Sequence, residues 1–304
     1  MKMHNNQKGF TLVEIMISLV LSLLVTYGIA QVLITSNQSS SSSDGVSQAQ
    51  ETARFVMSFF SRQVRIAGTD SINDSEITSV AAIDCNSGNL LAQQTCSMES
   101  NAGATEANIT GAAGVTSGDR FAIVSIPPAV DFQYPTPLGA PVIPPFNRTS
   151  ADCTGATPTG FTDDSRILNV FWVEVDPASN TNALFCQGYL FDGTNVDTTP
   201  ISGTAGRQVI ANGVEAMHVL YGEASVPSID GTRNVSRYVT ANQVADWNNV
   251  YAVKIAVMTR SISDITNIVT TKQYVMLDSG LYSFNDAINR QVFSSTFSIN
   301  NFED

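Results

Sequence analysis

Glu14 is the residue whose chemistry is least expected from its position, because it lies inside a long apolar segment. Between residues 10 and 34 it is the only side chain that would normally carry a charge. A lone carboxylate at membrane depth costs a few kcal/mol unless it is paired with a positive group. Glu14 therefore calls for a positively charged partner, and the segment that holds it must bring the two together.

Four cysteines, Cys85, Cys96, Cys153 and Cys186, all lie after the apolar segment, and none forms a CxxC pair. A zinc site would need all four at unusual spacing, because the chain has only two histidines. We therefore predict two disulfides, which require an oxidising compartment. Loop-closure entropy favours pairing Cys85 with Cys96, although four cysteines allow three connectivities.

The sequence does not indicate a catalytic or a nucleic-acid-binding function. Apart from His4, the only histidine is His218 in "EAMHVLYG", where apolar neighbours indicate a structural role. No GxSxG elbow, paired-carboxylate signature, P-loop or GxGxxG is present, so we expect neither an enzyme nor a cofactor. The net charge of −12, with 15 Lys plus Arg, disfavours binding to a phosphate backbone.

Two oxygen-rich stretches could attract calcium: "DSINDSE" at residues 70–76 and "SIDGTRN" at 228–234. Neither has the ligand spacing of an EF-hand, and both are typical of turns. We predict no metal site, with a calcium-binding module as the alternative.

The apolar segment at residues 10–34 would be about 37 Å long as a helix, enough to cross a membrane. Lys2 and Lys8 precede it, so the amino end is expected to be cytoplasmic and the rest of the chain outside. A plain anchor and a secretory signal cleaved before Gln31 are two interpretations.

The third interpretation accounts for Glu14. The stretch "KGFTLVE" resembles the signal of type IV pilins and type II secretion pseudopilins. The resemblance implies a leader at residues 1–9, cleavage by a prepilin peptidase between Gly9 and Phe10, and N-methylation of Phe10. Glu14 would then pair with the Phe10 ammonium of a neighbouring subunit. At ~4 Å and an effective dielectric near 20, that attraction is on the order of 4 kcal/mol before desolvation.

Two segments follow this membrane and assembly helix, which we place at residues 10–35. The Ser-rich run at 36–45 is expected to be a break or flexible joint, because serine and glycine are mediocre to poor helix formers. An amphipathic helix is predicted over 46–68, with Gly68 as its C-cap and with Arg54, Arg62 and Arg65 facing outward. Its apolar face comprises Val46, Ala49, Ala53, Val56, Phe60, Val64 and Ala67.

Residues 69–304 are predicted to form a β-rich head, giving an α+β, pilin-like fold with an antiparallel sheet. Runs rich in β-branched and aromatic residues indicate strands at 120–126, 167–175, 183–191, 207–222, 250–262, 268–277 and 290–299. In the run at 250–262, Tyr251, Val253, Ile255 and Val257 are expected to face the core. The proline-rich stretch 126–146 cannot be a central strand and is expected to be a surface excursion.

Three further stretches narrow the resemblance to PilW-type minor pilins: "QETARFVMSFFSRQVRIAG", "VEAMHVLYGEA" with "ADWNNVYAVKIAVMTRS", and "INRQVFSSTFSINN". The resemblance implies a subunit of the type IV pilus tip complex, which primes fibre growth. Its implied partners are other minor pilins, the major pilin, prepilin peptidase, the inner-membrane assembly machinery and a tip adhesin.

The location implied is the bacterial inner membrane, with the head in the periplasm, and afterwards the pilus at the cell surface. The runner-up is the J-like minor pseudopilin of type II secretion, a close relative that is usually shorter. An alternative from another class is an anchored or secreted binding domain with no role in a filament.

Overall fold

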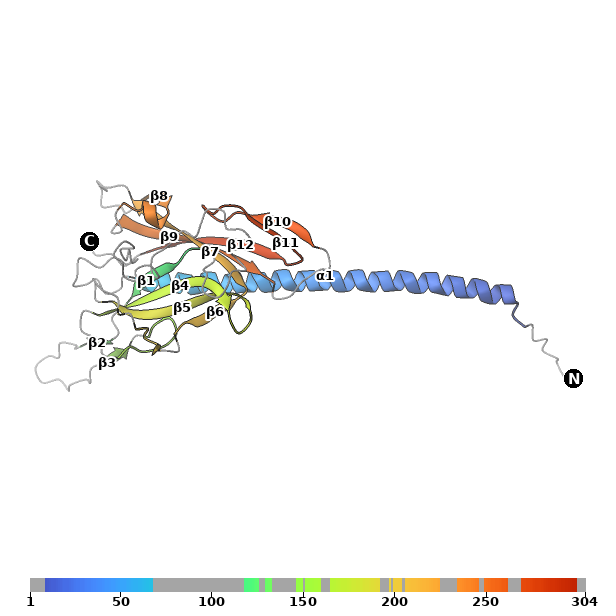
Figure 1. The fold of residues 1–304 in the computed structure, drawn as a ribbon, viewed down its shortest axis with the longest axis horizontal. Coiled ribbons are helices and arrows are strands. Elements are labelled where there is room, and N and C mark those ends of the chain that lie inside the picture. The colour runs from blue at the N-terminus through green and yellow to red at the C-terminus, as the bar shows by residue number, and fades with distance from the viewer. Residues whose placement is uncertain are drawn as a thin grey trace, which may run out of the picture.

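A computed structural model shows a single long helix that projects from a β-rich head (Figure 1). It describes residues 9–67, 118–125, 129–132, 146–149, 151–159, 165–191, 197, 199–203, 206–224, 234–245, 249–261 and 269–299. Cys85, Cys96, Gly68 and the oxygen-rich stretch 70–76 lie outside the described residues. The architecture is α+β and pilin-like, as predicted.

Helix α1 runs without interruption from Leu12–Ile66, 55 residues or about 82 Å. It passes through the Ser-rich run, so the break or joint predicted at residues 36–45 is absent. Serine costs only a few tenths of a kcal/mol per residue in a helix, and no proline interrupts the run. Helical segments on both sides can therefore propagate through it. The helix ends at the C-cap Ala67, whose N–H donates to the carbonyl of Val64 at 3.2 Å.

The carboxyl-terminal part of α1 is amphipathic, as predicted. Its buried residues are Gly45, Ala49, Ala53, Val56, Phe59, Phe60 and Val64, with Ala67 at the cap buried too. Arg54, Arg62 and Arg65 are exposed on the outer side. Val46 is only half-buried, and Phe59 joins the buried face although the sequence analysis did not assign it there.

The head contains two four-stranded antiparallel sheets. The first sheet has the order β1-β4-β5-β6, with β1 at Phe121–Ser125, β4 at Arg166–Asp176, β5 at Thr181–Phe191 and β6 at Gln208–Asn212. The second sheet has the order β12-β9-β7-β8, with β12 at Arg290–Ser298, β9 at Val250–Arg260, β7 at Val214–Ala224 and β8 at Val235–Val239.

Two hairpins and a short helix complete the described elements. The hairpins pair β2 (Ala129–Phe132) with β3 (Phe146–Thr149), and β10 (Thr270–Tyr274) with β11 (Tyr282–Asp286). A 3-10 turn, η3, spans Ala241–Gln243. β2 lies within the proline-rich stretch 126–146 and β3 begins at its last residue, and neither strand belongs to a four-stranded sheet.

Each predicted strand run contains an observed strand, but the run at 207–222 holds two. Gly213 has a φ of 75°, and this left-handed turn separates β6 in the first sheet from β7 in the second. The strands β8 and β11, five residues each, were not predicted. They carry mixed polar and apolar residues, and their pairing with a longer strand or a hairpin partner keeps them extended.

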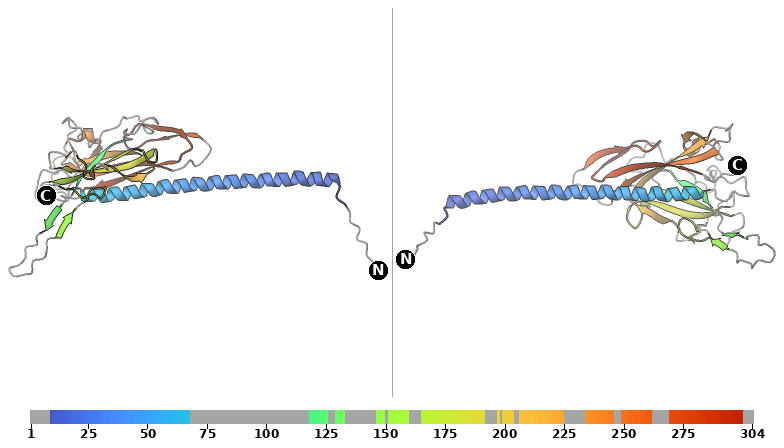
Figure 2. Two further views of the ribbon diagram at one scale, coloured as in Figure 1. Left: turned by 60° about the horizontal axis from the view of Figure 1, so that its bottom comes forward. Right: turned by 180° about the vertical axis from the view of Figure 1, so that it is seen from behind.

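The main core lies where α1 meets the inner faces of both sheets, and the left view of Figure 2 shows the helix lying along one side of the head. Phe60 contacts Phe171 and Phe121 edge-on, with ring centroids 5.4 and 6.1 Å apart. Phe59 contacts Phe171 in the same way at 5.6 Å. These aromatic contacts fix the helix to the first sheet through buried area and preferred ring geometry.

Strand β9 is buried on both faces. Val253, Ile255 and Val257 lie in the main core, as predicted, whereas Tyr251 is only half-buried and does not belong to it. On the opposite face Ala256 and Met258 are also buried, because the β10–β11 hairpin covers them with Tyr282 and Phe284. The sequence showed which face was more apolar, but not that a hairpin covers the other.

Cys153 and Cys186 form a disulfide with Cα atoms 6.2 Å apart. It ties the loop before β4 to the centre of β5, and the Cys153 N–H donates to Asn169 Oδ1 at 2.9 Å. The predicted disulfide at these two residues is confirmed. The other predicted disulfide, Cys85–Cys96, lies outside the described part of the chain.

Phe60→Ala should destabilise the head by about 3–5 kcal/mol, because it opens a cavity at the centre of the aromatic cluster. Phe55→Ala is the matched control on the same helix, since the Phe55 side chain is 47% exposed. Denaturant unfolding of the full chain in detergent would measure both. Equal losses for the two variants would contradict this account of the core.

Candidate functional site

The amino-terminal tip of α1 is open on all sides in this structure. A Cβ added at Gly9 would meet no atom within 4 Å, and Phe10 is 80% exposed. The helix begins at Leu12, one residue after Thr11, which adopts the extended conformation of an N-cap. Gly9 and Phe10 are thus an accessible, non-helical lead-in to α1.

Thr11 and Glu14 begin the helix together. The Thr11 Oγ1 accepts a hydrogen bond from the Glu14 N–H at 3.3 Å. Their spacing is that of a capping box, and the positive end of the helix dipole favours a carboxylate in the first turn. The sequence analysis missed Thr11, although the T-x-x-E pattern would have found it.

Glu14 is exposed, and no cation among the described residues lies within ion-pair distance of its carboxylate. The Thr11 cap and the helix dipole make the first turn of α1 a favourable place for a glutamate. The charge of the Glu14 carboxylate remains available to a partner from outside the chain.

The amino-terminal part of α1 is long and apolar enough to cross a membrane, and it is exposed throughout. Several of its hydroxyl groups form hydrogen bonds within the helix. Ser18 donates to the carbonyl of Glu14 at 2.7 Å, Ser22 to Leu19 at 2.9 Å and Thr26 to Ser22 at 2.8 Å. Because these hydrogen bonds are internal, these three hydroxyl groups need no outside partner when the helix faces lipid or other apolar helices.

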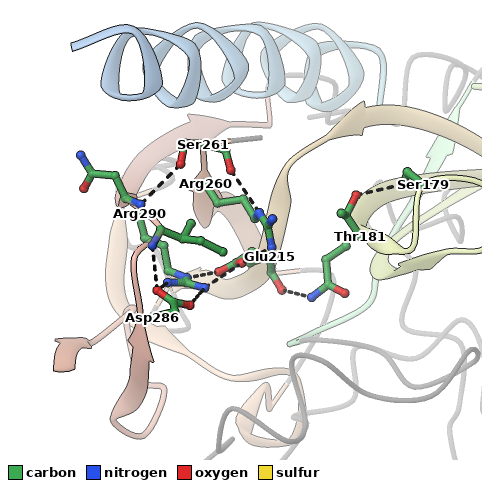
Figure 3. A network of polar contacts seen from close by, with 10 residues as sticks. Ser179, Thr181, Glu215, Arg260, Ser261, Asp286 and Arg290 are labelled. Carbon is green, nitrogen blue, oxygen red and sulfur yellow. Dashed lines mark hydrogen bonds and ion pairs between the residues drawn. The ribbon is translucent and has the colours of Figure 1, made fainter. Parts of the chain in front are cut away.

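A second set of charged residues lies inside the head, and we call it the polar clamp: Glu215, Arg260, Asp286 and Arg290 (Figure 3). Arg290 Nη2 donates to Glu215 Oε1 at 3.2 Å and to Asp286 Oδ2 at 2.7 Å. Its Nε donates to Glu215 Oε2, and its Nη1 donates to Asp286 Oδ1 at 2.8 Å. Arg260 Nη1 donates to Glu215 Oε1 at 3.3 Å.

The polar clamp is buried yet neutral, with two guanidinium groups facing two carboxylates. Arg290 is 5% exposed and Glu215 2%, and the Arg290 guanidinium lies over the Phe284 ring at 3.7 Å. Burial alone would lower the pKa of Arg290, but hydrogen bonds to Asp286 and Glu215 raise it. Burial would raise the pKa of Asp286, but hydrogen bonds from Arg290 and Ile288 hold it below its usual value. Both groups therefore stay charged in the folded head.

The polar clamp joins strands that are distant in sequence. Glu215 lies on β7, Arg260 ends β9, Asp286 ends β11 and Arg290 begins β12. Close by, Thr259 Oγ1 donates to the carbonyl of Ala49 at 2.9 Å, which ties β9 to α1 near the point where the helix leaves the head. The arrangement is suited to holding the helix and the second sheet together at the base of the head.

Three of the clamp residues come from three separate stretches on which the family resemblance rested. Glu215 follows Val214 in "VEAM", Arg260 precedes Ser261 in "MTRS", and Arg290 begins "RQVF". The backbone of Ser261 is fixed beside them, since its N–H donates to the carbonyl of Asn289 at 3.0 Å. The sequence analysis named these stretches without assigning a role to their charges. Only the fold shows that they meet.

His218 is buried and takes part in a local polar contact. Its Nε2 is 2.5 Å from the Tyr282 hydroxyl, and its Nδ1 is 3.7 Å from Asp119 Oδ2. That Asp119 oxygen also accepts the Val219 N–H at 2.8 Å. These contacts link β7 to β11 and to the segment before β1, which fits the structural role predicted for His218. Within the described ranges no cluster of three or more His, Cys, Asp or Glu side chains could hold a metal ion.

Arg290→Leu should destabilise the head by about 3–5 kcal/mol, because it leaves buried Glu215 and part-buried Asp286 without their shared partner. Arg237→Leu is the control: Arg237 also pairs with a glutamate, Glu223, but its side chain is 56% exposed. We expect a smaller loss there, since water can reach the position of the exposed guanidinium and the Ala245 N–H still donates to Glu223 Oε1 at 2.9 Å. The melting temperatures of both variants would be measured by thermal unfolding. Equal losses for the two variants would show that the polar clamp is not needed for the stability of the head.

Two family models match the chain. One, described as type IV pilus-assembly protein W, matches residues 170–301, a range that runs from β4 through β12 and includes the whole polar clamp. The other, the prokaryotic N-terminal methylation motif, matches residues 4–28 and includes Gly9, Phe10 and Glu14. Comparison with curated proteins and with solved structures finds no significant match. Residues 170–301 are therefore similar to the PilW family of type IV pilus-assembly proteins, and residues 4–28 carry the prokaryotic N-terminal methylation motif, which together support a PilW-type pilin.

Proposed function

We propose that this pilin is a minor subunit of the type IV pilus that joins the tip complex and primes fibre growth. A prepilin peptidase would cleave between Gly9 and Phe10 and methylate Phe10. The observation that carries the proposal is the exposed apolar helix with Glu14 in its first turn, continuous with a helix that is buried in a folded head.

Before assembly, the apolar part of α1 would hold the subunit in the inner membrane with the head in the periplasm. Cleavage would create an ammonium group at Phe10, at the same end of the helix as Glu14. In an array of parallel helices, the Glu14 carboxylate of one subunit would pair with the Phe10 ammonium of the next. Because both charges are costly in an apolar setting, only the axial register that pairs them would be favourable.

The continuous helix gives this register a mechanical consequence. An unbroken α1 fixes the distance between Glu14 and the head at about 1.5 Å per residue. Pairing at the membrane end would therefore set where the head sits along the fibre. The proposed partners are other minor pilins, the major pilin, the inner-membrane assembly machinery and an adhesin at the tip.

Gly9→Leu should leave the precursor uncut, because a large side chain would block the scissile position. Gly28→Ala is a suitable control, since Gly28 lies within α1, away from the cleavage site, and likewise has no atom within 4 Å of an added Cβ. Immunoblotting of cell membranes would separate precursor from mature chain. Normal processing of Gly9→Leu would count against cleavage at this site.

Glu14→Val should allow cleavage but reduce incorporation into fibres by about tenfold or more, since the variant lacks the charge that pairs with the neighbouring ammonium. Glu51→Val is the control, because Glu51 is an exposed carboxylate on the same helix beyond the apolar part. Sheared surface fibres would be probed for each variant. Wild-type incorporation of Glu14→Val would remove the pairing argument.

Deletion of the gene distinguishes the pilus role from the J-like pseudopilin role. Loss of surface pili and twitching, with protein export intact, supports the proposal. Loss of folded-protein export, with pili intact, would assign the chain to type II secretion instead.

A further inference from the structure

The outer strands of the two four-stranded sheets differ in how their free edges are protected. In the first sheet, β1 is buried along its whole length, and β6 has five residues and a register shift against β5. In the second sheet, β8 also has five residues and a register shift against β7. Short strands, burial and bulges are the devices by which proteins prevent unwanted strand pairing.

Strand β12 has none of these devices. It is nine residues long, it pairs with β9 without a register shift, and no other strand in the described part of the chain pairs with it. After Arg290 its sequence, "QVFSSTFS", contains no charged residue, proline or glycine. A long, regular and uncharged free edge is a template for an additional strand.

The backbone groups available at this edge follow from the register. The Ile299 N–H donates to the carbonyl of Tyr251 at 2.9 Å, so residue 299 points toward β9. Backbone direction alternates along a strand, so the N–H and C=O groups of the even-numbered residues point outward. These residues are Val292, Ser294, Thr296 and Ser298, and their side chains are exposed.

Apolar side chains along β12 are also incompletely covered. Phe293 and Phe297 pack against the main core but are only partly buried, and Val292 on the opposite face is 36% exposed. Side chains of an added strand would lie beside these residues on both faces. The edge thus offers hydrogen bonds and apolar contacts together.

We propose that the free edge of β12 binds an extended strand of a different subunit of the same fibre, which extends the second sheet by β-augmentation. The inference rests on the proposed function, because it takes the occupant from the neighbouring subunits of a filament. Main-chain hydrogen bonds would hold the strand, and the partly covered phenyl rings would select uncharged side chains opposite them.

A second copy of this chain cannot pair with the edge in the antiparallel manner of the other strands. β12 runs alongside α1 (Figures 1 and 2), so two copies paired antiparallel through β12 would point their α1 helices in opposite directions. Helices that enter the same membrane from one side cannot be arranged in this way. Parallel pairing is slightly less stable per residue, and no other free edge among the described strands reaches nine residues, so we take a different subunit as the occupant.

Proline scanning tests the edge while sparing the ladder to β9. Ser294→Pro and Thr296→Pro remove outward N–H groups and place a ring where the new strand would bind. Ser294→Ala and Thr296→Ala keep the N–H groups and are the controls. We expect each proline variant to be cleaved normally and to enter surface fibres at least about fivefold less than its alanine control, the equivalent of one lost hydrogen bond.

Thr296→Lys provides a second test that leaves the backbone donor in place. It adds to β12 the kind of charge that blocks edge pairing in other proteins. We expect it to reduce incorporation while the melting temperature of the full chain in detergent stays at that of Thr296→Ala. Incorporation at the control level by both Thr296→Pro and Thr296→Lys would overturn the proposal.

Photo-crosslinking identifies the occupant. The full chain with benzoylphenylalanine at position 294 would be irradiated in piliated cells and its adducts identified by mass spectrometry. An adduct with another subunit that carries an N-terminal methylation motif is the expected result. Adducts only between two copies of this chain, or none, would overturn it. If Gly9→Leu and Glu14→Val behave as predicted and the β12 variants do not, the edge proposal alone fails.

Discussion

The structure depends on one packing interaction, the contact of one face of the carboxyl-terminal part of α1 with both four-stranded sheets. Phe59 and Phe60 insert against Phe121 and Phe171, and the smaller residues Ala49 and Ala53 let the helix approach the second sheet closely. A helix of this length would have little reason to stay attached to a β-rich head without that contact. Once it is anchored, its free part projects in a defined direction, and the exposed apolar surface becomes available to a membrane or to other helices.

The polar clamp reinforces the same junction by a different physical route. Buried ion pairs seldom add much stability compared with apolar packing, but removing one partner is costly because it leaves a charge in a low-dielectric interior. The charges of Glu215 and Arg290 are paired only when β7, β9, β11 and β12 are all in their native register. The pair therefore favours the correctly folded arrangement of these strands. On our proposal, a condition of that kind would suit a subunit that must keep the shape of its base within a fibre.

A carboxylate lies in apolar surroundings at each end of the molecule. One is compensated within the chain, and the other, on our proposal, by a neighbouring subunit. In the head, Glu215 meets its guanidinium partners within the chain. At the tip of α1, the Glu14 N–H donates to Thr11 Oγ1, but the Glu14 carboxylate meets no cation among the described residues, and its proposed partner is another subunit. The first arrangement stabilises the fold, and the second, on our proposal, stabilises the assembly.

The sequence by itself determined the elements with strong local patterns. The apolar period of α1, the exposed arginines Arg54 and Arg62, the long strands β4, β5 and β9, and the charge anomaly at Glu14 follow from residue types and spacing, which act over a few residues. The short strands β8 and β11 lacked such a pattern.

Tertiary structure decided the features that the sequence did not predict, because these features depend on contacts between segments that are distant in the sequence. The Ser-rich run stays helical because flanking helix propagates through it, and the turn at Gly213 sends consecutive strands into different sheets. Glu215, Arg260 and Arg290 became neighbours only when four strand ends met, and β12 became a free edge only through the order of the sheet. Local sequence cannot encode these outcomes, since each depends on which groups the fold brings within contact distance.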